Sequence, residues 1–169
     1  MTAILVNPWI LALELPGTTT GSGIAYGVGT YAPGANRALY RPFWLPSTQR
    51  ISAVSFWCTT TASANYDIGI YSTDGITRLD SKGSTALAAS QINTWTLTTP
   101  MLIPANIPYV LGFVCSSASA SFVAEGAVAA PQMRTMGWMA ESSALPLPAT
   151  ATPVANTADY LPIFALTFV

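Results

Sequence analysis

Proline and glycine recur so often along this chain that few stretches are long enough to form a helix. The 169 residues include 13 prolines and 12 glycines, and both residue types weaken or end helices. Between them lie short runs rich in β-branched and aromatic side chains, separated by clusters of serine and threonine. The pattern therefore predicts many short strands joined by turns, with almost no helix.

These runs predict an all-β fold, an antiparallel β-sandwich that is jelly-roll-like, because such folds combine about eight short strands. The clearest runs alternate apolar and polar residues, which is typical of a strand with one buried face. The expected strands are 38–45, 51–59, 66–71, 76–79, 84–89, 94–98, 109–115, 121–129 and 160–169. The side chains expected in the core are Val54, Phe56, Ile68, Ile70, Leu97, Leu111 and Phe113.

Residues 1–35 are expected to form an extended N-terminal arm and connector, ahead of a sandwich domain at 36–169. Residues 4–15 are apolar and interrupted at Pro8, whereas residues 16–36 are rich in glycine and threonine. A flexible connector of this length spans roughly 25 Å, enough to reach a neighbouring subunit. Alternatively, the arm adds an edge strand to its own sandwich. The arm residues predicted to dock on another chain are Ile4, Leu5, Trp9, Ile10, Leu11 and Leu13.

Charged residues make up only 8% of the chain, against about 25% in an average soluble domain. This favours an oligomer, because specific interfaces are depleted of charge at their cores. The net charge is −1 and the basic residues form no stripe, which argues against nucleic acid as a partner. The opening apolar run has no basic start and contains Pro8 and Glu14, so it predicts neither a secretory signal nor a membrane span. We therefore expect the protein to be made in the cytoplasm.

The residue types on which most enzymes and metal sites depend are scarce. The chain has no histidine, which excludes Ser-His-Asp and Cys-His catalysis and every zinc site that uses histidine. Two cysteines cannot complete a four-cysteine zinc site, and no phosphate-binding loop occurs. We therefore predict no catalytic activity, no metal and no cofactor. Cys58 and Cys115 lie in apolar runs, which predicts two buried thiols, with a disulfide as the alternative.

Several aromatic residues are candidates for a contact surface. The segment 133–139 reads MRTMGWM, and tryptophan, methionine and arginine are enriched where proteins meet. We predict an assembly contact there in preference to a sugar-stacking platform. Trp57 and Trp95 lie in alternating strands and are assigned to a sandwich face. The predicted contact residues of the segment are Met133, Met136, Trp138 and Met139.

Five motifs stand in an order that resembles a known group of domains. They are YRPFWLP at 40–46, ISAVSFWCT at 51–59, DIGIYSTDG at 67–75, TWTLTTPMLIPANIPYVLGFVCS at 94–116 and the final LPIFALTF. Their order resembles that in the jelly-roll domains of bacteriophage virion proteins, such as head fibres, decoration proteins and tail-fibre tips. One turn departs from the pattern, because PANIPY stands where these domains usually have a glycine.

The resemblance implies a homotrimeric surface module without catalytic residues. We therefore expect a non-enzymatic structural protein on a phage virion surface, made in the host cytoplasm, that assembles with copies of itself and with other virion proteins. The alternative is a carbohydrate-binding receptor-recognition module that binds a host surface glycan, which the five tryptophans and seven tyrosines favour. A secreted enzyme is a third possibility, against which the missing signal and the missing histidine argue.

Overall fold

Every regular element in the described part of the chain is a β-strand. The computed structural model describes residues 3–5, 28–60, 63–125, 139–142, 145–155 and 162–169. All strand pairs in these ranges are antiparallel. The expectation of an all-β, antiparallel fold is therefore confirmed.

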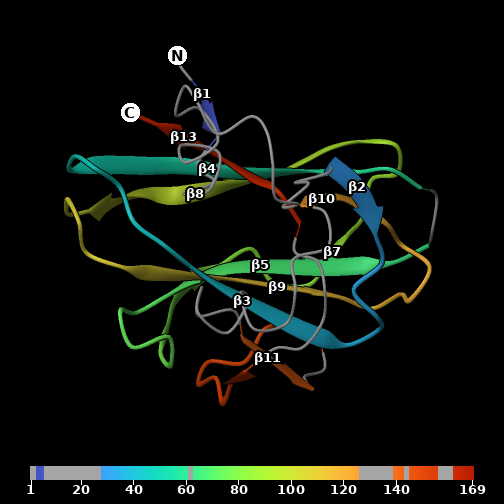
Figure 1. The fold of residues 1–169 in the computed structure, drawn as a ribbon. Helices are drawn as coiled ribbons and strands as arrows, with labels where there is room; N and C mark the ends of the chain where they lie inside the picture. Colours follow the sequence, from blue (N-terminus) through green and yellow to red (C-terminus); the bar gives the residue numbers. More distant parts are fainter. Residues whose placement is uncertain (1–2, 6–27, 61–62, 126–138, 143–144, 156–161) are drawn as a thin grey trace, which may run out of the picture.

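The strands form two sheets that lie one above the other (Figure 1). In the six-stranded sheet, the central strand pairs with three others. Its order is β1 (Ala3–Leu5), β13 (Phe164–Phe168), β4 (Gln49–Cys58), β10 (Phe122–Glu125) and β2 (Val28–Tyr31), with β8 (Gln91–Ile103) on β4. The seven-stranded sheet has the order β12 (Val154–Ala155), β11 (Met139–Ser142), β3 (Arg37–Phe43), β9 (Tyr109–Cys115), β5 (Asn65–Tyr71) and β6 (Arg78–Ser81), with β7 (Thr85–Ala86) on β5.

The main core fills the space between the two sheets and is built around aromatic rings. Phe56 of β4 contacts Phe113 of β9 edge to face, with ring centroids 5.2 Å apart, and Phe113 contacts Phe122 at 5.0 Å. Such pairs add to the stabilisation that burial of apolar area already provides. The prediction of the core is confirmed, because each of its seven residues is buried: Val54, Phe56, Ile68, Ile70, Leu97, Leu111 and Phe113.

A second, smaller core covers the outer face of the seven-stranded sheet. Residues 145–155 cross the side of this sheet that faces away from the other sheet (Figure 1), and Met139 of β11, a strand of the same sheet, packs against the cluster. Tyr40 and Tyr71 meet there with ring centroids 5.2 Å apart. The buried members of this cluster are Ala38, Tyr40, Tyr71, Val110, Val114, Leu147 and Ala151.

Two paired glycines make room for this second core. Gly69 of β5 pairs with Gly112 of β9. A Cβ atom at Gly112 would lie 2.7 Å from the Tyr71 ring and 3.2 Å from the Tyr40 ring. The bare backbone therefore lets both tyrosine rings approach the sheet closely at this position.

Some strand boundaries differ from those that the sequence predicts. The interval 16–36, expected to be a connector, contains β2, which pairs with β10. The short strand expected at 94–98 extends to Gln91–Ile103. Pro100 does not end this strand, because it lies where the register slips between Thr96↔Ala53 and Met101↔Ile51, and proline is tolerated at such irregularities.

We predict that Gly112→Ala lowers the free energy of unfolding by about 1–3 kcal/mol, the usual cost of overpacking a close-packed site. The added methyl group has to displace the Tyr71 ring. Urea denaturation followed by tryptophan fluorescence measures the change. In the double variant with Tyr71→Leu, the total loss is expected to be smaller than the sum of the single losses. Strictly additive losses would contradict the steric explanation.

Candidate assembly surface

An apolar groove opens on the outer face of the six-stranded sheet. Its volume is about 360 Å³, and strands β4, β8, β10 and β13 all contribute to it. None of the described residues that line it is charged. The lining residues are Ser55, Phe56, Trp57, Ile92, Val123, Ile163 and Ala165.

Strand alternation and register bring these side chains together. Val54, Phe56 and Cys58 face the core, so Trp57 projects outward on the same strand. Trp57 pairs with Ile92 of β8, and these two side chains are 43% and 59% exposed. The alternation thus places large apolar side chains side by side on a surface that faces water.

Polar groups at the groove are already paired with each other. The hydroxyls of Ser55 and Thr94 lie 2.9 Å apart and share a hydrogen bond across β4 and β8. The backbone N–H of Ile163 donates to the carbonyl oxygen of Val123 at 2.9 Å. The groove therefore offers a partner apolar contact area rather than hydrogen-bonding groups. A contiguous apolar patch of this kind is typical of an interaction site.

Three of the residues that the sequence predicts for assembly lie in the described part of the chain. Ile4 and Leu5 belong to β1, which pairs with β13 of the same chain, as the edge-strand alternative supposes. Met139 begins β11 and packs, half-buried, against the second core. The others lie outside the described residues: Trp9, Ile10, Leu11, Leu13, Met133, Met136 and Trp138.

The two tryptophans assigned to a sandwich face lie on opposite faces of the six-stranded sheet. Trp95 is buried between the sheets, whereas Trp57 lies in the groove. The signal for this difference is present in the sequence, because Trp57 is one residue away from each of two core positions, Phe56 and Cys58. Ile92 carries no such signal, since the predicted strand begins only at residue 94.

Buried carboxylates are the other candidates for chemistry, and Asp67 is the most enclosed of them. Its two oxygens accept the backbone N–H groups of Leu147 at 2.9 Å and Gly83 at 2.8 Å. Burial raises the pKa of the Asp67 carboxyl, and these two hydrogen bonds partly oppose the rise. Both oxygens are therefore occupied in holding the covering segment 145–155 and the turn after β6 to the sheet.

A second carboxylate fastens the same covering layer. Tyr40 donates its hydroxyl to Glu141 Oε1 at 2.5 Å, while Glu141 Oε2 accepts the backbone N–H of Thr152 at 2.6 Å and its hydroxyl at 2.8 Å. Burial and the hydrogen bond to Glu141 raise the pKa of the Tyr40 hydroxyl above its usual range. This arrangement keeps Tyr40 protonated and acting as a donor.

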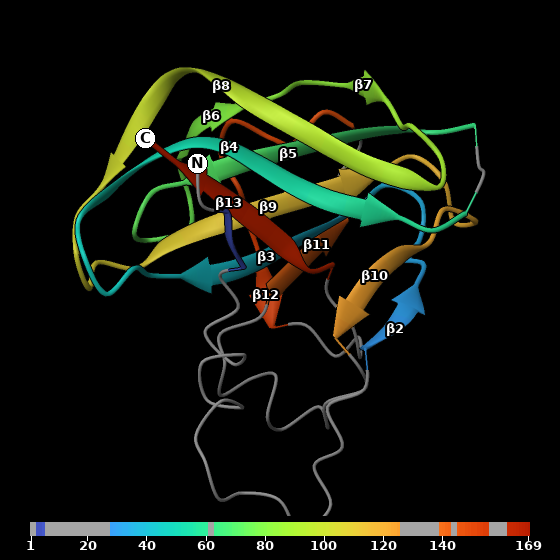
Figure 2. The ribbon, with the colours of Figure 1, turned by 90° about the horizontal axis from the view of Figure 1, so that it is seen from above.

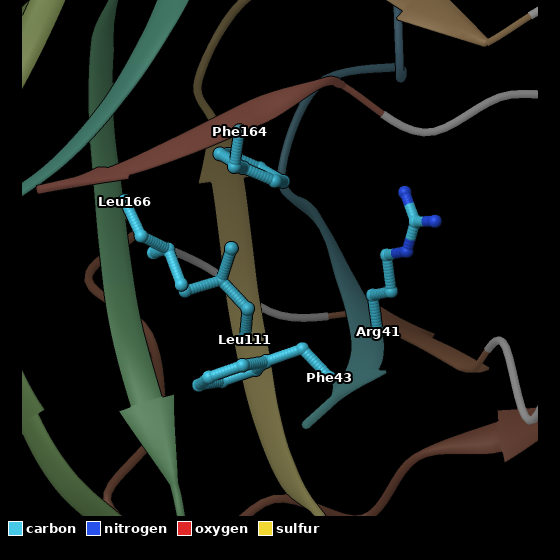
Figure 3. A pocket seen from close by; sticks show the side chains of 5 residues that line it. All are labelled: Arg41, Phe43, Leu111, Phe164 and Leu166. Carbon is cyan, nitrogen blue, oxygen red and sulfur yellow. The ribbon is translucent and has the colours of Figure 1, made fainter. Parts of the chain in front are cut away.

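Between the sheets, the described residues enclose one cavity that is too small for a ligand. A cavity of about 10 Å³ between the sheets is lined by Arg41, Phe43, Leu111, Phe164 and Leu166. Figure 3 shows the guanidinium group of Arg41 pointing away from the four apolar side chains. This volume accommodates about one water molecule, whereas small-molecule sites usually measure 300 Å³ or more, as an order of magnitude.

The thiols and acidic groups add no further site. Cys58 and Cys115 are both buried and not bonded to each other, and burial raises the pKa of Cys115, so it stays a neutral thiol. Within the described ranges, no three histidine, cysteine or acidic residues come close enough to bind a metal ion. No helix in those ranges is long and apolar enough to cross a membrane.

No family model matches the chain, and no curated protein matches it significantly.

We predict that stability depends on pH through Asp67. A carboxyl whose pKa is raised by folding contributes stability below its unfolded pKa, and this contribution is lost as the pH rises through the folded value. The unfolding free energy of the native chain, relative to Asp67→Asn, should therefore fall as the pH is raised from about 3 to about 8. Asp67→Asn itself should cost about 1–3 kcal/mol, because an amide cannot accept both N–H groups.

Asp74 provides a control of opposite sign in the same experiment. The Ser72 hydroxyl and the Ile76 N–H hold the pKa of this exposed carboxyl below its usual value. Its contribution is therefore present above the unfolded pKa and lost as the pH falls. Denaturation curves for both asparagine variants across the pH range measure the two trends. The same trend for both variants would contradict the assignment of Asp67.

Proposed function

We propose that this protein is a non-enzymatic structural protein that acts by assembling with copies of itself and with other proteins on a phage virion surface. The observation that carries the assembly role is the uncharged, exposed groove at Trp57 and Ile92. A monomer would leave this apolar surface in water. Association would remove it from water, at roughly 25 cal/mol for each Å² buried.

We also propose that the sandwich is a jelly roll, and the path of the chain supports this. The strands from β2 to β10 divide into the orders β2-β10-β4-β8 and β3-β9-β5-β6. The chain crosses to the opposite sheet between β2 and β3, β3 and β4, β4 and β5, β7 and β8, β8 and β9, and β9 and β10. Such repeated crossing is expected of the two Greek keys that make up a jelly roll.

The location on a virion rests on the resemblance of the five motifs to phage jelly-roll domains. The proposed jelly-roll topology agrees with that resemblance, although proteins of unrelated function share this fold. Antibody raised against the purified protein, applied to phage particles from a lysate of its host, tests the location. Surface labelling seen by electron microscopy is expected. Particles without label, in a lysate where the protein is expressed, would contradict a place on the virion.

The lining of the groove favours protein over carbohydrate as the partner. A sugar site combines an aromatic platform with polar groups that bind hydroxyls. Among the described lining residues, Ser55 provides the only side-chain hydroxyl, and it is hydrogen-bonded to the hydroxyl of Thr94. A glycan array probed with the native protein and with Trp57→Ser separates the two functions. Binding to a glycan that Trp57→Ser abolishes would replace assembly with receptor recognition.

We predict that the native chain associates in solution, as a trimer if the resemblance holds, and that Trp57→Ser weakens this association about 30-fold. Removing a tryptophan from the centre of an interface costs about 2 kcal/mol or more. Sedimentation velocity over a concentration series measures the effect. The matched control is Trp44→Ser, which removes an equally exposed tryptophan outside the groove. A native chain that stays monomeric would refute self-assembly, and equal losses from both variants would refute the role of the groove.

A further inference from the structure

Strand β8 leaves one of its edges without a described partner. It is the longest strand, with 13 residues, and among the described residues it pairs with β4 alone. Figure 2 shows it at the border of the six-stranded sheet. Such an edge presents a row of backbone N–H and C=O groups that can accept another strand.

The free edge of β8 carries no charged side chain, whereas the edge strand β6 of the other sheet does. Strand β6, which pairs only with β5 in the described chain, contains Arg78 and Asp80 and is followed by Lys82. Charged side chains of this kind discourage pairing with a further strand. The sequence of β8, QINTWTLTTPMLI, contains no charged residue at all.

The first half of β8 is regular and firmly held. From Gln91 to Thr96 its register with β4 is unbroken. The side chain of Asn93 braces the beginning of the strand, because its Oδ1 accepts the N–H of Ala88 and its Nδ2 donates to the Ala88 carbonyl oxygen, both at 2.8 Å. Such a strand needs little further ordering before it binds a partner.

We propose that β8 pairs with β8 of a second copy of this chain, antiparallel and about a two-fold axis near Thr94. The inference rests on the proposed assembly function and names a contact that joins copies in pairs, separate from the three-fold contact of a trimer. Thr94 lies at the middle of the regular stretch and is exposed on the outer face. In the pair it faces the same residue of the second copy, and threonine pairs across strands are favourable.

The edge itself selects a second copy as the occupant. An uncharged strand meets an identical strand without repulsion, and a two-fold axis makes one surface complementary to itself. Continuity with the groove supports the same partner. Ile92 lines the groove and belongs to the regular stretch of β8, so pairing at this edge also covers the exposed Ile92 side chain.

Charge exchange at Thr94 tests the proposal on the full-length chain. Thr94→Lys and Thr94→Glu each place like charges opposite each other across the axis, so each variant alone should associate at least about tenfold more weakly than the native chain. Mixed in equal amounts, the two variants should recover association as a mixed pair. Sedimentation velocity measures both effects, and circular dichroism melts verify that each variant is folded.

Thr73 provides the matched control, because it is an exposed threonine in the turn that follows β5 of the other sheet. Thr73→Lys and Thr73→Glu should associate like the native chain. If both folded Thr94 variants associate normally while the native chain oligomerises, the edge pairing is wrong and the proposed function stands. If each is weakened but the mixture does not recover, β8 contacts some other surface and the two-fold pairing is wrong. If the native chain is monomeric, the proposed self-assembly is itself wrong.

Discussion

The contact between Phe56 and Phe113 joins the central strands of the two sheets, and the rest of the structure depends on it. Each ring also contacts Phe122 and Phe164, so four strands meet at one aromatic cluster. Because side chains alternate along a strand, an inward Phe56 requires an outward Ser55 and Trp57. The same interaction that builds the core therefore also places a tryptophan on the outer surface.

The two outer faces of the sandwich differ in how their apolar side chains are covered. On the seven-stranded sheet, the chain covers its own apolar face with residues 145–155 and fastens them through Asp67 and Glu141. These acids are costly to bury unless each oxygen is bonded, and here the bonds are made to the covering layer itself. On the six-stranded sheet, the part of the groove lining that the structure describes contains no acidic or basic residue. Its apolar character supports the proposed contact with a partner.

Sequence alternation predicts the core well and the surface poorly. The buried residues of β4 and β5 could be identified because apolar residues recur with a period of two, and those of β9 because its run is almost continuously apolar. Strand β2 was missed because Val28–Tyr31 lies in a glycine-rich stretch with no alternation. The covering segment was missed because its proline-rich sequence is typical of a loop, and its order comes from contacts with Asp67 and Tyr71 that are distant in the sequence.

The candidate surface, too, could be predicted from the sequence only in part. Because side chains alternate along a strand, the position of Trp57 between Phe56 and Cys58 predicts that it lies outside the core. No local pattern, however, predicts that it lies beside Ile92. That neighbour relation depends on the register of β4 with β8, and register is set by tertiary packing. Likewise, the sequence QINTWTLTT indicates a strand but not an edge, because being an edge depends on what pairs beside it. An uncharged strand in the middle of a sheet has both edges paired, whereas at the border of a sheet it can pair with a strand of another chain. The lack of charge in β8 therefore becomes informative only when the sheet topology is known.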